Sequence, residues 1–121
     1  MTHQTHSYKD LFVWQKAMLL VDLIYDLTSK FPSSEAYGLI SQMRRAAVSI
    51  PSNIAEGRRR ASRKDYRQFL IVAYSSGAEL ETQVEICTRI QITRHLSFDA
   101  VSGTLTEVMS MLNKMCHQLR S

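Results

Sequence analysis

The chain has 121 residues, a net charge of +4 and a sequence pI near 9.3; 45% of its residues are hydrophobic and 21% are charged. These figures fit one folded domain and exclude a disordered, collagen-like or low-complexity chain. Two cysteines, Cys87 and Cys116, are too few for a disulfide scaffold of the secreted type, which favours a reducing compartment.

The polar stretch 1–9 contains His3 and His6 and lacks the apolar core of a signal peptide. No stretch of the sequence approaches the roughly 20 apolar residues that span a bilayer. We therefore expect a cytoplasmic protein in which residues 1–9 form a flexible tail and residues 10–121 form the folded domain.

The first predicted helix covers residues 10–30. Asp10 is placed to cap its start, and Pro32 ends it by disfavouring helical geometry at Phe31. Its predicted apolar seam is Leu11, Trp14, Met18, Val21, Tyr25 and Thr28, widened by Ala17, Leu20 and Ile24.

The second predicted helix covers residues 34–57, with Glu35 in its first turn. Its apolar period runs through Leu39, Met43, Ala46 and Ile50 to Asn53 or Ile54. Because this period continues past Pro51, we expect a kink near residues 47–51 rather than a stop. Gly57 is predicted to end the helix in a left-handed conformation.

The third and fourth predicted helices begin near Ser62 and Ser97. Ser62 and Asp65 have the spacing of a capping box. The two seams are Tyr66, Leu70, Ala73, Gly77, Leu80, Val84, Cys87 and then Phe98, Val101, Leu105, Val108, Leu112, Met115, Leu119. The small residues Ala73, Ser76 and Gly77 favour close approach of another helix, with Ala46 and Ala47 as the expected counterpart.

Four amphipathic helices joined by short turns predict an all-α protein. The expected architecture is an up-down-up-down antiparallel four-helix bundle whose second helix is kinked at Pro51.

Catalytic and metal-binding patterns are weak. None of the six glutamates has a histidine three residues later, as inward-facing di-iron sites require, and no glycine-rich phosphate loop is present. His3 and His6 have ligand-like spacing but lie on the predicted tail, and Cys87 falls on an apolar seam. We expect no catalytic residues, metal ligands or cofactor, and hence no enzyme.

Pro51, Asn53, Glu56 and Gly57 form an unusual motif inside the second helix. A structural role explains it directly: Pro51 bends the helix, and Ser49, Ser52 or Asn53 binds the carbonyl that Pro51 frees. Glu56 either joins this polar network or pairs with an arginine. A hydrolase site built on Asn53 and Glu56 is the less favoured alternative.

Basic residues are concentrated between positions 44 and 67. Within this window only Glu56 and Asp65 oppose eight cations, so it carries +6 and the rest of the chain −2. Arg63 and Lys64 fall in the first turn of a predicted helix, where cations are unfavourable by about 0.3–1 kcal/mol each. Three explanations stay open: bound phosphates, the acidic residues Glu79, Glu81 and Glu85 of a neighbouring copy, or a solvated patch. The candidate nucleic-acid-binding residues are Arg44, Arg45, Arg58, Arg59, Arg60, Arg63, Lys64 and Arg67.

Three stretches of the sequence carry a family resemblance: Leu11–Ala17, Tyr37–Gly57 and Phe69–Gln83. The most specific is Ser-Ile-Pro-Ser-Asn-Ile-Ala-Glu-Gly, from Ser49 to Gly57. In these stretches the chain resembles the four-helix-bundle proteins encoded within 23S ribosomal RNA intervening sequences, and the similarity extends from about Tyr8 to Leu119. The family more often has Gly-Ser where this chain has Tyr74-Ser75-Ser76-Gly77.

The resemblance implies a bacterial, cytoplasmic bundle that assembles into a ring-like homopentamer, and it supplies no catalytic residues. A related branch, the accessory variability proteins of diversity-generating retroelements, binds nucleic acid through basic surfaces and partners a reverse transcriptase. The leading hypothesis is therefore a non-enzymatic oligomer that binds RNA or DNA, with RNA favoured. The alternative is a protein-interaction scaffold whose basic segment forms the subunit or partner interface.

Overall fold

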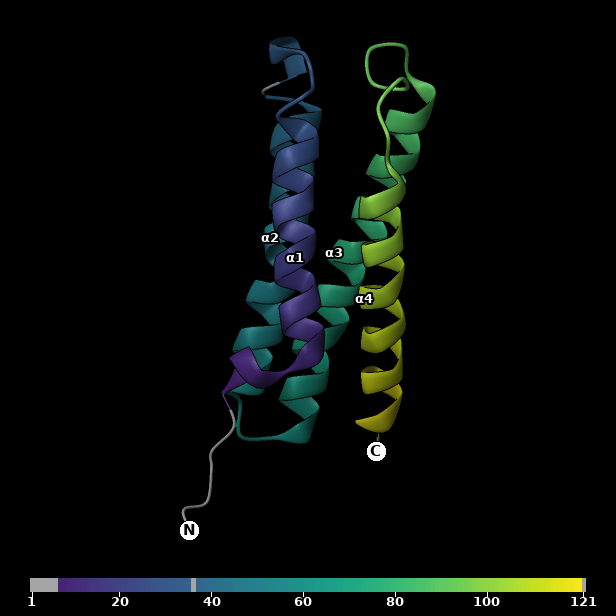
Figure 1. Cartoon of the computed structure of the whole chain (residues 1–121). Helices are drawn as coiled ribbons and strands as arrows, with labels where there is room; N and C mark the ends of the chain where they lie inside the picture. The colour runs from purple at the N-terminus through teal and green to yellow at the C-terminus, as the bar shows by residue number, and fades with distance from the viewer. Residues whose placement is uncertain (1–6, 36, 121) are drawn as a thin grey trace.

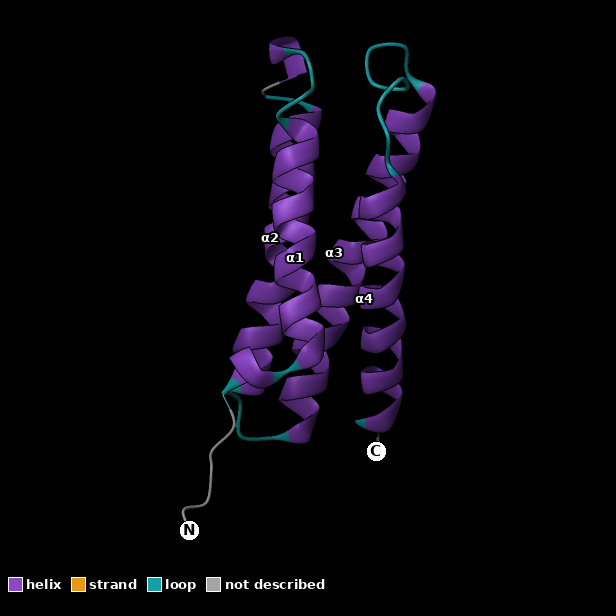
Figure 2. Ribbon diagram, viewed as in Figure 1, coloured by secondary structure: helices purple, strands orange, loops and turns teal. Residues whose placement is uncertain are grey.

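Four α-helices lie within residues 7–35 and 37–120, the part of the chain that the computed structural model describes. They are α1 (Phe12–Thr28), α2 (Leu39–Arg58), α3 (Arg63–Arg89) and α4 (Asp99–Gln118), and the single-turn 3-10 helices η1 (Tyr8–Asp10) and η2 (Ser33–Glu35) precede α1 and α2. No strand occurs in the described residues (Figure 2). The all-α prediction is confirmed.

Successive helices run in opposite directions (Figure 1). α1 packs against α2 and α4, and α3 packs against the same two helices, so the four form a closed square with α1 diagonal to α3. The predicted up-down-up-down bundle is confirmed. The turn between α2 and α3, the helix η1 and the C-terminal end of α4 all gather at one end of the bundle, the lower end in Figure 1.

The core is formed by apolar side chains from all four helices. The seams predicted for α3 and α4 are confirmed from Leu70 to Cys87 and from Phe98 to Leu112, where every seam residue is buried. The largest fully buried side chains include Leu20, Ile24, Met43, Ile50, Ile54, Leu70, Leu80, Val108 and Leu112.

The seam predicted for α1 is wrong in part. Met18 and Tyr25 are exposed, whereas Thr28 and the widening residues Ala17, Leu20 and Ile24 are buried as expected; Val13 and Leu27 complete the buried stripe. α1 carries apolar residues on several sides, so periodicity alone does not decide which side faces inward. Its contacts with both α2 and α4 decide it, because the residues that face both neighbours are the ones that lose their solvent.

Three helix starts differ from the prediction. Leu11 rather than Asp10 caps α1, without a side-chain hydrogen bond, because Asp10 lies in η1. Tyr8 and Lys9, expected in the tail, also belong to η1, whereas residues 1–6 lie outside the described residues. α2 begins at Leu39, not near residue 34, and the Glu35 carboxylate accepts a 3.4 Å hydrogen bond from the Leu39 backbone N–H.

The predicted start of α4 is wrong by two residues, whereas the predicted cap of α3 is confirmed. α4 begins at Asp99, two residues later than expected. At α3 the predicted cap is confirmed, since the Ser62 hydroxyl accepts a 3.1 Å hydrogen bond from the Asp65 backbone N–H.

α2 continues through Pro51 as one helix, so the prediction that Pro51 does not stop it is confirmed, and the bend stays a prediction. The side chains expected to bind the freed Ala47 carbonyl bind others. The Ser52 hydroxyl donates to the Val48 carbonyl at 2.7 Å, and the Asn53 amide donates to the Ser49 carbonyl at 2.8 Å. Each side chain binds the carbonyl four residues earlier, and both Val48 and Ser49 follow Ala47 in the sequence. Neither side chain therefore binds the Ala47 carbonyl.

Gly57 does not have the predicted left-handed conformation. It lies inside α2, and no described residue has a positive φ. A Cβ atom built on Gly57 would lie 2.7 Å from the Phe69 Cβ and 3.2 Å from the Tyr66 carbonyl oxygen, both on α3. The glycine is therefore required for the close approach of α2 to α3.

The small residues of α3 serve two different neighbours. The Ser76 and Ser49 hydroxyls share a 2.8 Å hydrogen bond between α3 and α2, which fits the expected close approach of these helices. Gly77 instead leaves space for the Met109 side chain of α4. The predicted neighbours of Gly77 were Ala46 and Ala47 of α2.

Candidate nucleic-acid interface

Six of the eight predicted cations meet at the end of the bundle where α2 stops and α3 starts. The C-terminal end of α4 lies beside these cations, as the hydrogen bond between Arg63 and Gln118 shows. This end of α4 contributes a further cation, Arg120. We call this surface the basic end; its cations are Arg58, Arg59, Arg60, Arg63, Lys64, Arg67 and Arg120.

Arg44 and Arg45 are not part of the basic end. They lie about 20 Å from Arg58 along α2, at 1.5 Å per residue. The Arg44 Nε donates to the Thr28 hydroxyl at 2.8 Å, and its guanidinium carbon lies 4.3 Å from the centre of the Tyr25 ring. Arg44 thus joins α2 to the end of α1. Arg45 is exposed and makes no hydrogen bond or ion pair with another described residue.

Arg63 and Arg67 bind the last turn of α4. An Arg63 guanidinium N–H donates to the Gln118 carbonyl at 2.8 Å, and the Arg67 Nε donates to the Cys116 carbonyl at 2.9 Å. Carbonyls in the last turn of a helix have no partner within the helix, and the helix dipole favours cations there. Capping of α4 therefore accounts for Arg63 in the first turn of α3, a position for which the sequence alone leaves three explanations open. Lys64 has no such partner among the described residues.

Aromatic rings lie under two further arginines. The Arg59 guanidinium carbon is 5.2 Å from the centre of the Tyr8 ring, and that of Arg60 is 4.7 Å from the centre of the Phe69 ring. These contacts hold the guanidinium groups in place without neutralising their charge.

Among the described residues, Arg60 is the one cation of the basic end with a carboxylate partner. Its guanidinium lies 2.7 Å from the Glu56 carboxylate, one turn earlier on α2. Glu56 thus takes the second of its two predicted roles, pairing with an arginine rather than joining the Asn53 network. The remaining cations contact carbonyls, rings or solvent, so most of the positive charge persists.

Lys64, Arg67 and Arg120 line a surface hollow of about 460 Å³ together with Gln68 and Leu119. Sequence reasoning missed Arg120 because it lies 53 residues beyond Arg67, and only the antiparallel packing of α3 on α4 brings the two together. The one available signal was its place just after a predicted helix end.

Burial shifts the pKa values of three side chains in the bundle, Tyr66, Cys87 and Cys116. Burial raises the pKa of the Tyr66 hydroxyl, and the charge of Arg58 opposes this shift. Burial also raises the pKa values of the Cys87 and Cys116 thiols, whereas a nucleophilic cysteine needs a lowered pKa. Both cysteines are free thiols, and Cys87 is fully buried as the apolar seam indicates.

Residues 7–35 and 37–120 contain no cluster of three or more histidine, cysteine, aspartate or glutamate side chains that could hold a metal ion. His3 and His6, which have ligand-like spacing, lie outside the described residues. None of the helices that the structure describes combines the length and apolar character needed to cross a membrane.

A family model described as 23S rRNA-intervening sequence protein matches residues 9–114. The chain belongs to this family. No curated protein matches it in sequence. Membership confirms the resemblance drawn from the Ser49–Gly57 motif, and the structure explains that motif in this 23S rRNA-intervening sequence protein. Pro51 is buried, Asn53 binds Ser49, and Gly57 admits α3, so these three residues build the fold and only Glu56 touches the basic end.

Proposed function

We propose that this 23S rRNA-intervening sequence protein binds RNA through the phosphate contacts of its basic end and catalyses no reaction. The supporting observation is that seven cations from three helix ends lie at one end of the bundle, while Glu56 alone among the described carboxylates pairs with any of them. Arg59, Lys64 and Arg120 form no hydrogen bond through their side chains to described residues, so they are available to phosphates. Arg63 and Arg67 each keep further N–H groups after capping α4.

Binding to a short labelled RNA is expected to depend steeply on salt. Each phosphate that the basic end neutralises releases counterions, and log K falls by about 0.7 per phosphate for each tenfold rise in salt with single strands. Four to six contacts then weaken binding by roughly 100-fold between about 50 and 200 mM salt. Fluorescence anisotropy across a salt series measures this slope. A flat salt dependence, or no binding at low salt, contradicts the proposal.

A homo-oligomer is proposed on separate grounds, and the number of subunits that family resemblance implies is five. On α1, Phe12 is 63% exposed and Leu19 43% exposed, and the partly buried Leu23 extends the same side. Apolar side chains at this spacing on one outer face are typical of a helix that another chain covers.

Charges on this face are expected to separate the subunits. The double variant Phe12→Glu with Leu19→Glu should elute as a single chain, because two carboxylates would have to be buried in the interface. Light scattering coupled to size exclusion gives the mass. The matched control is Thr106→Glu with Ser110→Glu on the exposed side of α4, which should keep the wild-type mass. A single-chain mass for the unmodified protein refutes the oligomer.

A further inference from the structure

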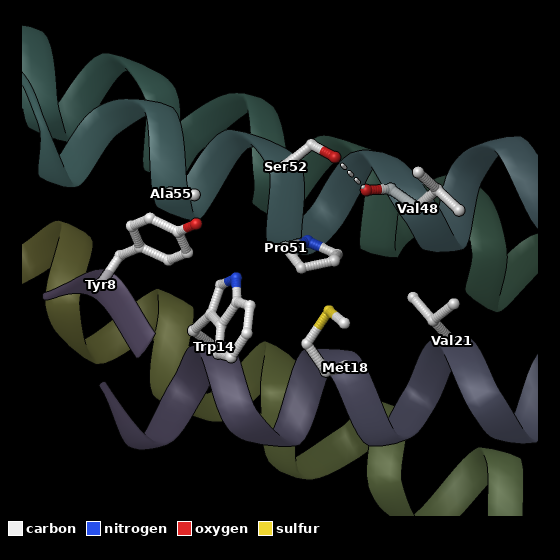
Figure 3. A pocket seen from close by; sticks show the side chains of 8 residues that line it. All are labelled: Tyr8, Trp14, Met18, Val21, Val48, Pro51, Ser52 and Ala55. Atoms are coloured by element: carbon white, nitrogen blue, oxygen red, sulfur yellow. Dashed lines mark hydrogen bonds between the residues drawn. The ribbon is translucent and has the colours of Figure 1, made fainter. Parts of the chain in front are cut away.

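A pocket of about 310 Å³ lies between α1 and α2 and ends beside the basic end. Trp14, Met18 and Val21 project into it from α1, and the Pro51 ring faces them from α2 (Figure 3). Val48 belongs to the lining as well. Tyr8 of η1 closes the end of the pocket nearest Arg59. The volume is at the lower end of the range typical of small-molecule sites.

The pocket stays open because α2 presents small side chains to α1. Ser52 and Ala55 lie one turn apart on the α2 wall and do not reach across to the Trp14 indole (Figure 3). Met18 is 39% and Val48 40% exposed, so apolar surface that a fifth element could cover is left in contact with water. Such surface in a recess favours an apolar or aromatic occupant.

The pocket has the chemistry that recognises a nucleobase. The Tyr8 and Trp14 rings meet edge to face, with centres 5.3 Å apart and an angle of 69° between their planes. Arg59 lies over the Tyr8 ring, so a cation stands beside the end of the pocket that Tyr8 closes. Unpaired bases stack on aromatic side chains and on guanidinium planes while the adjoining phosphates pair with cations. The Ser52 hydroxyl, which donates to the Val48 carbonyl at 2.7 Å, keeps its lone pairs for a base N–H.

We propose that the α1–α2 pocket holds one unpaired base of an RNA whose phosphates lie on the basic end. This inference rests on the proposed function and narrows it to single-stranded RNA. The pocket is recessed between two helices, so a base that is paired and stacked in a duplex cannot enter it without leaving the duplex. A helix of a second copy is the competing occupant, and the experiment below separates the two.

Trp14 is the only tryptophan of the chain, so its fluorescence reports on the pocket alone. A short single-stranded RNA should quench Trp14 emission, whereas an abasic strand of the same length should bind without quenching. The abasic strand should also bind about 5- to 150-fold more weakly, the range for loss of one stacked base. A perfect duplex of the same sequence should not quench.

Three outcomes overturn the inference in distinguishable ways. Equal affinity for intact and abasic strands without quenching leaves phosphate binding at the basic end intact but removes the base pocket. Failure of every strand to bind removes the proposed function as well. Trp14 emission that changes with protein concentration and not with RNA assigns the pocket to a second copy of the chain.

Filling the pocket gives an independent test. Ala55→Leu places a larger side chain against Trp14 and should bring the affinities for intact and abasic strands to within about twofold, with the salt slope unchanged. Ala100→Leu, an exposed position on α4, is the matched control and should keep the wild-type preference. Circular dichroism verifies that both variants are folded. A folded Ala55→Leu variant that still prefers intact strands contradicts the pocket.

Discussion

Reversing Arg59, Lys64 and Arg120 to glutamate should weaken RNA binding by at least about 100-fold at low salt and reduce the salt slope by roughly two units. These three cations were chosen because their side chains form no hydrogen bond to other described residues, and the contact of Arg59 with the Tyr8 ring is the one side-chain interaction among those residues that the reversal removes. Arg63 and Arg67 are unsuitable for this purpose, because their loss would uncap α4 as well as remove charge.

The matched control reverses Arg45, Arg89 and Arg94, three exposed arginines away from the basic end. Both triple variants lower the net charge of +4 by six units. The control also removes the ion pair of Arg89 with Glu85, an exposed contact that contributes little to stability. The control should keep the wild-type salt slope. Equal losses in the two variants would show that net charge, and not the basic end, attracts RNA.

The same pair of variants tests the scaffold alternative. If the basic end is a subunit interface that meets Glu79, Glu81 and Glu85 of a neighbouring copy, reversal there should dissociate the oligomer. If the basic end binds RNA, the oligomer mass by light scattering should stay unchanged while RNA affinity falls. RNA affinity that survives reversal while the mass drops contradicts the proposed function and favours the scaffold.

Alanine at Gly57 should destabilise the bundle by about 2 kcal/mol, whereas alanine at Gly103 should stabilise it by about 1 kcal/mol. At Gly57 the new methyl group would meet the Cβ of Phe69 and the backbone of Tyr66, atoms that cannot rotate away, so α2 and α3 must separate. At Gly103 no atom lies within 4 Å of the new Cβ, and alanine simply favours the helix.

Thermal unfolding at one fixed protein concentration measures both changes. For a chain of this length the melting temperature should fall by roughly 5–10 °C for Gly57→Ala and rise by about 3–5 °C for Gly103→Ala. A rise for both variants would indicate that only intrinsic helix propensity matters at Gly57, and the close approach of α2 to α3 would not be required there.

Local sequence patterns predicted the parts of the fold that depend on neighbours within one or two turns. The seams of α3 and α4 carry a three-four period with charged residues elsewhere, and Ser62 lies three residues before Asp65, so both features were read correctly. The seam predicted for α1 is wrong at Met18 and Tyr25 because that helix has more than one apolar side. The sequence period gives the spacing of the apolar residues along a helix, but it does not determine which neighbouring helix packs against them.

Some residues of the candidate site could likewise be predicted from the sequence, and others could not. The sequence located the basic segment from residue 58 to residue 67, because clustered charge is visible in any linear scan. It could not exclude Arg44, whose partners Thr28 and Tyr25 belong to another helix. It also could not place Trp14 and Tyr8 near Arg59, since Trp14 lies on a predicted apolar seam and looks like core, while Tyr8 falls in the predicted tail.

Four amphipathic helices, their order, their family and the segment that carries the charge all follow from the amino-acid sequence. Which cations cap α4 and which stay available follows only from the packing of the helices. Arg63 reaches a carbonyl 55 residues away, and Arg67 one 49 residues away. The physical reason is that hydrogen bonds and charge pairs form between groups a few ångströms apart in space, and only the antiparallel packing of α3 and α4 sets those distances.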